Sequence, residues 1–453
     1  MPERTTARTT ARGAVAAVAD EGSFTELPPP PTDRAGKPNG PLDWQGYADS
    51  RARATERTGE TESVVCGTAA VGGREVALLS FEFGFLGGSL GERTGDRIEA
   101  AYTHAREHRL PVVSLIATGG SRMQEGMLAL TQLQRVARQS ALTRAAGLAQ
   151  LAVVRDPTTG GGWATLGAGA DVVLALPGAQ VGFAGSRVRP PDADPAAYTA
   201  QGQLAAGAVD EVVRPEELAG RLALWLRLLS AEAPHAPTAA DPPRALGRTD
   251  LPATGWDAVE RARSAQRPRA GAYLDAYFTE RLAISGDRCG GTDPGMLCGF
   301  GLHEGRPVAF AAQAGTATRP AGYRTAARLV RLAEHLRIPV LTLVDTPGAA
   351  NDAEAERAGA GAAIADLFAA VAAATVPLTT LVIGEGGSGG ALALAAPGNT
   401  WVTPDSYFSV IAPELAAAIL KRPADQVRSL ADELRLRPQD LAELALVQGT
   451  VTR

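Results

Sequence analysis

The chain has 453 residues, a length that suggests about two to four domains. It carries 44 lysines and arginines against 49 aspartates and glutamates with the two signs interspersed, so the positive surface of a nucleic-acid-binding protein is not expected. No apolar run reaches the ~18–20 residues that a helix needs to span a bilayer, so no membrane segment is expected either.

The three cysteines, Cys66, Cys289 and Cys298, show no C-x-x-C spacing. This spacing disfavours disulfides and a zinc ribbon, so we expect no metal on this chain. The first residues, MPERTTARTTAR, have no apolar stretch after their charges, so we expect no secretory signal. Together these features predict a cytoplasmic protein.

The first domain is expected to follow a flexible N-terminal arm. Residues 1–40 are rich in Thr, Arg, Pro and Gly, which predicts partial disorder. A domain over residues 41–230 comes next. Two apolar runs on either side of Gly72 and Gly73 are typical of a β-hairpin over residues 64–83. Beyond it, the apolar patterns predict helices at 92–108 and 123–146 and strands at 111–118 and 151–155.

A second domain is expected after a linker. Residues 231–255 contain five prolines and little apolar periodicity, which is typical of an interdomain linker. From 256 to 453 strand and helix patterns alternate again. Both halves are therefore expected to be α/β domains.

The second half repeats the first. Residues 109–120 read RLPVVSLIATGG, and residues 337–348, at an offset of 228, read RIPVLTLVDTPG. The same offset aligns VRDPTTGGG at 154–162 with the glycine-rich stretch after Val382. The two copies slip by one residue near Pro177 and Pro404, and VGFAG at 181–185 then falls opposite SVIAP at 409–413. Two tandem copies of one α/β domain explain these blocks better than the alternative, in which two unrelated α/β domains merely share the order strand, turn and helix.

Each copy carries a glycine-rich turn between an apolar strand and an apolar helix: Gly160-Gly161-Gly162 in the first, and Gly386-Gly387-Ser388-Gly389-Gly390 in the second. Glycine lets the backbone approach a ligand, and the first helical turn has unpaired N–H groups. Such groups bind phosphate or stabilise an oxyanion. The simpler alternative is tight packing of strand against helix.

Other glycine-loop chemistries fit poorly. A Walker loop needs a lysine that is absent, and a Rossmann fingerprint belongs on the first turn of its unit, not a late one. The G-x-S-x-G match at 386–390 lacks the downstream histidine of a hydrolase. The five histidines, which are expected to be solvated, are His104, His108, His235, His303 and His335. The remaining chemistry is oxyanion stabilisation, with a base supplied by substrate or cofactor.

Several motifs carry a resemblance to a known family. FEFGFLGGSLG (81–91), TGGSRMQEGM (118–127), DPTTGG (156–161) and GFAG (182–185) resemble the carboxyltransferase β subunit of bacterial acetyl-CoA carboxylase. PAGYR (320–324), DTPGA (345–349), GEGGSGGA (384–391) and YFSVIAPE (407–414) resemble its α subunit. The chain resembles a β–α fusion, which implies two tandem crotonase-type spiral domains.

The resemblance implies a reaction: carboxybiotin on a carrier protein gives its carboxyl group to acetyl-CoA, or a short acyl thioester, and malonyl-CoA results. Gly160 and Gly161 would stabilise the thioester enolate, and Gly389 and Gly390 the biotin oxyanion. The substrate-binding residues implied are Gly119, Gly120, Arg122, Gly386 and Gly387. Malonyl-CoA serves fatty acid and polyketide biosynthesis, so either pathway is an expected destination.

Several departures from the family lie near the expected site. The zinc ribbon and the helical extension of the α subunit are absent, the loops after Gly315 and Gly348 differ, and Thr159 replaces a usual Met. These changes leave open whether the acyl carrier is CoA or a carrier protein. No biotinylation motif or ATP-binding signature is present. Biotin carboxylase and the biotin carboxyl carrier protein are therefore expected as separate chains.

Two other functions stay open. A biotin-independent malonyl-thioester decarboxylase would need only the first glycine turn, and the altered loop after Gly348 favours it. A non-catalytic paralogue or scaffold is disfavoured by retention of all four late-turn glycines, Gly160, Gly161, Gly389 and Gly390. Because family active sites form between a β-type and an α-type domain of different protomers, the resemblance also implies a homodimer or a higher oligomer.

Overall fold

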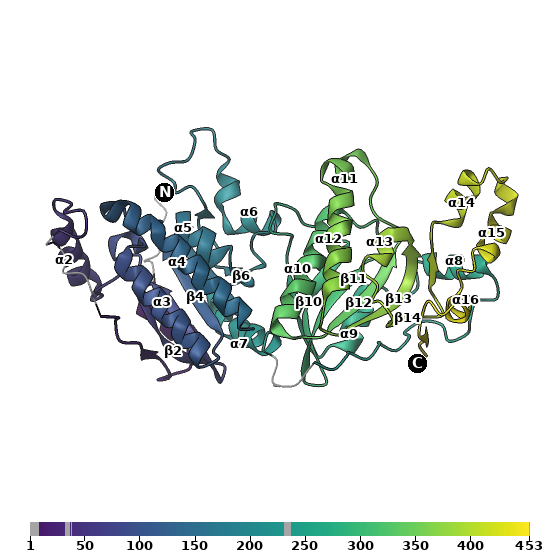
Figure 1. Ribbon diagram of the computed structural model, residues 1–453, viewed down its shortest axis with the longest axis horizontal. Coiled ribbons are helices and arrows are strands. Elements are labelled where there is room, and N and C mark those ends of the chain that lie inside the picture. The colour runs from purple at the N-terminus through teal and green to yellow at the C-terminus, as the bar shows by residue number, and fades with distance from the viewer. Residues whose placement is uncertain (1–8, 32–36, 38, 231–236, 453) are drawn as a thin grey trace. The chain divides into compact units, whose positions relative to one another are not determined.

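The computed structural model describes residues 9–31, 37, 39–230 and 237–452. The chain divides into two compact units, residues 1–230 and 231–453. Each unit is built on an eight-stranded sheet with helices packed on it, so the expected α/β class is confirmed (Figure 1). No described helix combines the length and apolar character needed to cross a membrane.

The first unit has its strands in the order β1-β2-β3-β4-β5-β6-β8, with β7 beside β5. β1 to β3 pair antiparallel and the remaining neighbours pair parallel. The strands are β1 (Thr25–Glu26), β2 (Val64–Val71), β3 (Arg74–Phe81), β4 (Val112–Thr118), β5 (Gln150–Thr159), β6 (Val172–Ala175), β7 (Val181–Gly182) and β8 (Glu211–Val212). Gly72 and Gly73 both have positive φ and form the predicted hairpin turn.

The helices of the first unit lie close to their predicted positions. Figure 1 shows α3 and α4 lying across the sheet, where they pack on each other. A buried cluster that includes Leu79, Ile98, Ile116, Val136 and Trp163 joins these layers. The helices are α1 (Ala11–Val18), α2 (Tyr47–Thr58), α3 (Glu92–Glu107), α4 (Gly126–Ala145), α5 (Gly160–Gly162), α6 (Ala200–Ala205) and α7 (Leu218–Leu228), with a 3₁₀ turn η2 at Met123–Glu125.

The second unit repeats this order as β9-β10-β11-β12-β13-β14-β16, with β15 beside β13. Its strands are β9 (Glu280–Ile284), β10 (Met296–His303), β11 (Arg306–Gln313), β12 (Val340–Thr346), β13 (Leu378–Gly387), β14 (Thr400–Val402), β15 (Tyr407–Ser409) and β16 (Gly449–Thr450). Its helices are α8 (Gly255–Arg263), α9 (Ala270–Tyr277), α10 (Pro320–Leu336), α11 (Ala353–Arg357), α12 (Ala360–Ala373), α13 (Ser388–Leu392), α14 (Pro413–Ile419), α15 (Val427–Glu433) and α16 (Pro438–Glu443).

The sheet registers show the repeat at single-residue resolution. Thr118 pairs with Thr158 between β4 and β5, and Thr346 pairs with Gly386 between β12 and β13, after a register shift at the same point of each ladder. These pairs are related by the offset that the sequence predicted. The predicted alignment of 181–185 with 409–413 is wrong by one residue, because Thr158 pairs with Val181 while Gly386 pairs with Phe408, so Val181 corresponds to Phe408. Tandem copies of one fold are therefore confirmed.

The expectation of a flexible arm over residues 1–40 is wrong for residues 9–31. Residues 11–18 form α1, whose buried side chains Ala11, Ala14, Val15 and Val18 recur at helical spacing. The Ala11 N–H donates to Glu82 Oε2 at 2.7 Å, and β1 adds an edge strand to β2. Residues 11–18 are ordered because the apolar face of α1 is buried. Residues 1–8, 32–36 and 38 lie outside the described part.

The expected linker, 231–255, is also corrected in part. Residues 237–253 lack regular structure, yet they are fixed to the second unit. Ala240 and Ala245 belong to its core cluster, and the carbonyl of Ala240 accepts a hydrogen bond of 2.6 Å from Thr379 Oγ1. The segment also donates, because the Arg248 N–H bonds to Asp405 Oδ2 at 2.8 Å. Residues 231–236 lie outside the described residues.

Candidate active site

The two glycine-rich turns lie at the carboxyl ends of equivalent strands, where ligands bind in open α/β sheets. β5 ends at Thr159 and helix α5 begins at Gly160, while β13 ends at Gly387 and α13 begins at Ser388. The first helical residue has φ of 63° at Gly160 and 60° at Ser388. Both turns are therefore the same sharp strand-to-helix bend, and at Ser388 a non-glycine residue adopts this strained conformation.

The structural equivalence of Gly160 and Ser388 agrees with the offset of 228 between the two copies. Gly161 then corresponds to Gly389, and Gly162 to Gly390. The resemblance, by contrast, assigned Gly160 and Gly161 to the first turn and Gly389 and Gly390 to the second. The sheet register supports the equivalence of Gly160 and Ser388, because the strand pairs that lead into the two turns follow the offset of 228.

Hydrogen bonding shows which N–H groups of the first turn are already occupied. The Gly160 N–H donates to the carbonyl of Phe183 at 3.0 Å, so it is already committed. Among the described residues no acceptor is found for the N–H of Gly161 or Gly162. Gly162 has φ −65° and ψ −38°, an ordinary helical conformation. The free donors of the first turn are therefore Gly161 and Gly162, which are the unpaired N–H groups of a helix start.

In the second turn Gly389 and Gly390 hold the positions that the sequence predicted. No acceptor for either N–H is found among the described residues, and a Cβ on Gly389 would meet no atom within 4 Å. The Gly390 carbonyl is held from the other side, by Gln313 Nε2 at 3.2 Å and by the Tyr323 hydroxyl at 3.1 Å. Burial raises the pKa of Tyr323, so its hydroxyl keeps the proton that it donates. The Gly390 peptide is thus fixed, next to the open space at Gly389.

Gly119 and Gly120 lie against the first turn, but their N–H groups are occupied. The Gly119 N–H donates to the Gly87 carbonyl at 2.9 Å, and the Gly120 N–H donates to Thr118 Oγ1 at 3.1 Å. A Cβ on Gly160 would lie 3.0 Å from the Gly120 Cα, so the two loops touch. These glycines permit a close approach of backbones, and their contact with substrate stays a prediction.

Gly386 and Gly387 also serve close packing. Both belong to β13, where they pair with Phe408 and Ser409 of β15. A Cβ on Gly387 would lie 2.1 Å from the Pro347 carbonyl oxygen, so only glycine fits against the DTPG loop there. Their contact with substrate stays a prediction.

Arg122 is not placed to contact a substrate, contrary to the expectation from the resemblance. Its side chain is 0% exposed and forms ion pairs with Glu62 and Glu125. Burial alone would raise the pKa of Glu62, but the charge and hydrogen bonds of Arg122 lower it below the ordinary value. A guanidinium held this way would have to break several charge-assisted bonds to reach a ligand.

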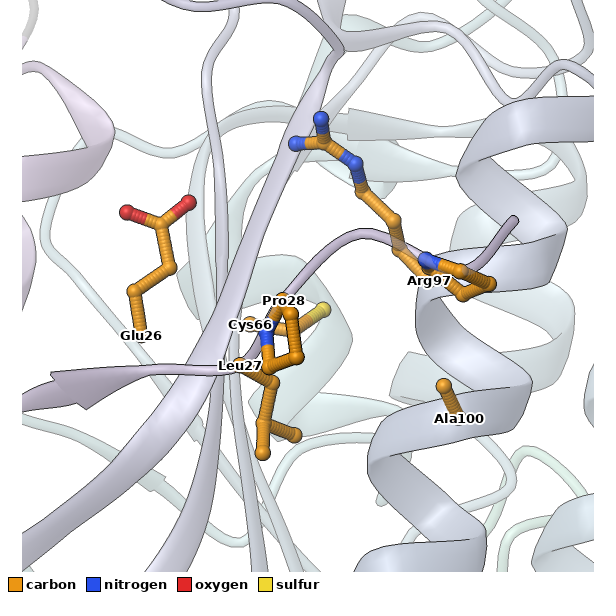
Figure 2. A pocket seen from close by; sticks show the side chains of 7 residues that line it. Glu26, Leu27, Pro28, Cys66, Arg97 and Ala100 are labelled. Carbon is orange, nitrogen blue, oxygen red and sulfur yellow. The ribbon is translucent and has the colours of Figure 1, made fainter. Parts of the chain in front are cut away.

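The described histidines and a small hollow lie outside the glycine turns. His303 is half-buried and stacks on Tyr277 with 3.7 Å between ring centres, and His335 is half-buried, so the expectation of solvated side chains is wrong for these two. The rings of His104 and His108 stack on each other at the C-terminal end of α3, close to Glu107. His235 lies outside the described residues. Figure 2 shows a small hollow whose lining includes Cys66 and Arg97.

Thiol chemistry can be tested directly. Burial raises the pKa of the Cys66 thiol to about 12 and also raises that of buried Cys298, whereas Cys289 is exposed. We expect iodoacetamide to label Cys289 alone in the folded protein, as read by peptide mass spectrometry. A Cys289→Ser variant should then resist labelling and keep full activity. Labelling of native Cys66, or activity lost with Cys289→Ser, would contradict this.

Comparisons with known proteins agree with the motifs. Residues 40–210 match the family described as carboxyl transferase domain, and residues 250–453 match acetyl co-enzyme A carboxylase carboxyltransferase-like. The acetyl-coenzyme A carboxylase carboxyl transferase subunits beta/alpha of Saccharopolyspora erythraea are 37% identical over 95% of this chain and 78% of that protein. Those of Salinispora arenicola are 38% identical over 98% and 82%.

A further relative and a solved structure extend this likeness. The probable biotin-dependent acyl-coenzyme A carboxylase beta3 subunit of Mycobacterium bovis is 33% identical over 89% of this chain and 83% of its own length. The transcarboxylase 12S hexamer crystallised with methylmalonyl-coenzyme A shares the fold with a TM-score of 0.79 and 20% identity, over 98% of this chain and 87% of that chain. The expectation of two tandem crotonase-type domains is thereby confirmed.

Proposed function

Since this chain belongs to the family of biotin-dependent acyl-CoA carboxyltransferases, as a β-subunit-like half followed by an α-subunit-like half, we propose that it moves a carboxyl group from carboxybiotin to acetyl-CoA or a short acyl thioester. The product with acetyl-CoA is malonyl-CoA, for fatty acid or polyketide biosynthesis. The observation that carries this proposal is the pair of unoccupied N–H donors on each of two equivalent turns.

The first turn is suited to the acyl-CoA side. As a proton leaves the α carbon, negative charge develops on the thioester oxygen, and the N–H groups of Gly161 and Gly162 point outward from a helix start toward such an anion. Gly160 contributes the bend, since its left-handed backbone turns the chain from strand to helix. Each preorganised donor of this kind stabilises a transition state by about 2.7–4 kcal/mol.

The second turn is suited to the biotin side. The open space beside Gly389 and the free N–H groups of Gly389 and Gly390 fit a carbonyl oxygen that gains negative charge. When bound, biotin supplies the carboxyl group and the ureido nitrogen that serves as base. Gln313 and Tyr323 contribute by fixing the Gly390 carbonyl, so that the donors need no reorganisation during the reaction.

The partners follow from the same proposal. We propose that biotin arrives on a biotin carboxyl carrier protein loaded by a biotin carboxylase, both on other chains, and that this chain forms a homodimer or a higher oligomer. Light scattering of the purified chain measures the oligomeric state. A monomer that is fully active with free biotin would overturn the oligomer proposal.

A carboxyl-exchange assay tests the function. The protein is incubated with free biotin and malonyl-CoA, and acetyl-CoA formation is followed, with propionyl and carrier-protein thioesters in parallel. Biotin-dependent formation of acetyl-CoA is the expected result. Consumption of malonyl-CoA without biotin would instead identify the decarboxylase, and no reaction with any thioester would favour a non-catalytic scaffold. The preferred acyl group and carrier are read from the ratios of kcat/KM.

A further inference from the structure

A buried ion pair lies beside the first glycine turn and is not used by the proposed chemistry. Arg122 and Glu62 are both almost completely buried, with side-chain exposures of 0% and 1%. The guanidinium binds both carboxylate oxygens of Glu62, and it also donates to Glu125 Oε1 at 3.2 Å and to the Ser89 carbonyl at 2.8 Å. The fork of arginine is therefore fully occupied, which fixes its backbone relative to Ser89.

The Arg122–Glu62 pair lies where the loop that contains Leu90 is hydrogen-bonded to the loop that contains Gly120. Backbone bonds join Leu90 N–H to the Gly120 carbonyl at 2.9 Å and Arg122 N–H to the Leu90 carbonyl at 2.8 Å. The joined loops then contact the turn. Gly120 lies against Gly160, and a Cβ on Gly162 would lie 3.4 Å from Leu90 Cδ1. A displacement of Arg122 is thus passed to the residues that start helix α5.

The network also reaches two helices. Glu125 Oε2 accepts the Glu92 N–H at the start of α3, and the Tyr47 hydroxyl of α2 donates to Glu125 Oε1 while it accepts from Arg122. Burial raises the pKa of Tyr47, so this hydroxyl stays protonated. The ion pair is therefore braced by secondary structure on two sides.

The second unit has a buried pair below its own turn. Asp345 and Arg267 have side-chain exposures of 0% and 2%. Asp345 Oδ1 accepts the Glu385 N–H at 3.2 Å, and Arg267 donates to the Ile383 carbonyl at 3.2 Å. The pair therefore fixes the last stretch of β13, directly before Ser388.

The two pairs do not occupy repeated positions. At the offset of the repeat, Arg122 corresponds to Ala350 and Asp345 corresponds to Ala117. The ion pairs therefore occur at different points of the common fold, although each lies next to the same kind of turn. Shared ancestry of the two copies does not account for this placement, whereas a shared need for a rigid turn does.

We propose that Arg122 with Glu62, and Arg267 with Asp345, are positioning residues that hold the two glycine turns in the geometry in which their N–H groups donate. This inference rests on the proposed carboxyltransferase function for its kinetic consequence. Its structural consequence, the rigidity of the two turns, is independent of the reaction. A misplacement of about 1 Å at such a site can cost about 10²-fold in rate.

Arginine-to-lysine variants test the proposal, because lysine keeps the charge and loses the fork. We expect Arg122→Lys and Arg267→Lys to lower kcat by about 10–100-fold while KM changes by less than about threefold. The matched controls are Arg135→Lys and Arg331→Lys, whose ion pairs with Glu99 and Asp366 are partly exposed. These controls should leave kcat within about twofold of wild type.

Amide hydrogen exchange supplies a readout that needs no activity. In Arg122→Lys we expect faster exchange at the N–H groups of Leu90, Gly119 and Gly160, and in Arg267→Lys at that of Glu385, because these are the bonded amides next to each pair. Unchanged exchange together with unchanged kcat in folded variants would overturn the proposal.

The design separates this inference from the function on which it rests. If wild type shows no carboxyl exchange, the proposed function fails, and the exchange rates of the amides still decide whether the pairs hold the turns. If Arg122→Lys does not fold, Tyr47→Phe removes one hydroxyl from the same network. It should speed exchange at Gly119 to a smaller degree, and wild-type exchange rates there would count against the proposal.

Discussion

Replacement of Gly390 by alanine is expected to lower kcat for carboxyl transfer by about 10²–10³-fold, the effect of losing one oxyanion donor. A Cβ on Gly390 would lie 2.5 Å from the Ala349 backbone nitrogen and 2.5 Å from the Tyr323 hydroxyl. The Ala349 backbone cannot rotate away as a flexible side chain can. The first turn of α13 must therefore move outward, and the Gly390 N–H loses its direction.

The measurement is steady-state exchange between malonyl-CoA and free biotin, together with the melting temperature of each variant. Gly361→Ala is the matched control, because Gly361 lies in helix α12 and a Cβ there meets no atom within 4 Å. Alanine at such a helical site is expected to stabilise the protein by about 0.4–1 kcal/mol and to leave the rate unchanged. Full activity in a folded Gly390→Ala protein would refute the assignment of this donor.

Replacement of Asp345 by alanine is expected to lower the free energy of unfolding of the second unit by about 3–5 kcal/mol, the cost of leaving a buried partner charge uncompensated. Asp345 is fully buried and pairs with Arg267 and with Arg269, the latter at 3.2 Å. It also accepts the Glu385 N–H, so its loss removes support from β13 as well.

Urea denaturation followed by hydrogen-exchange mass spectrometry measures this loss, because peptides of the second unit report their own transition. Asp366→Ala provides the control. Asp366 also pairs with an arginine, Arg331, but the two side chains are 40% and 54% exposed. Such a surface pair is worth about 0–1 kcal/mol. Equal destabilisation by the two variants would show that burial does not set the strength of the Asp345 pairs.

The sequence was sufficient for the repeat and for the two turns. Apolar runs at 111–118 and 337–348 predicted buried strands, which the structure has as β4 and β12. Glycine clusters at 160–162 and 386–390 predicted strand-to-helix turns, since few other residues permit such a bend. These features are local, because they depend on side-chain alternation and on backbone freedom within a few residues. The motifs at these positions also identified the family.

Features that depend on distant contacts were not predicted. The N-terminal arm is rich in residues typical of loops, yet α1 is ordered because the sheet offers a surface for Ala11 and Val15. The resemblance placed Arg122 at the substrate, and nothing nearby in the sequence indicates that Glu62, sixty residues earlier, neutralises it in the interior. Both features depend on burial by residues that are distant in the sequence.

The hydrogen-bond donors of the two turns were predicted only in part from the sequence. By itself the sequence determined that two glycine-rich turns end equivalent strands and that each offers backbone N–H groups. It could not determine which N–H groups are free, because the Gly160 donor is occupied by the carbonyl of Phe183, which reaches it only after β7 pairs with β5. Strand register, a property of the folded sheet, therefore decided that the Gly160 N–H is occupied and that, among the described residues, those of Gly161 and Gly162 are without an acceptor.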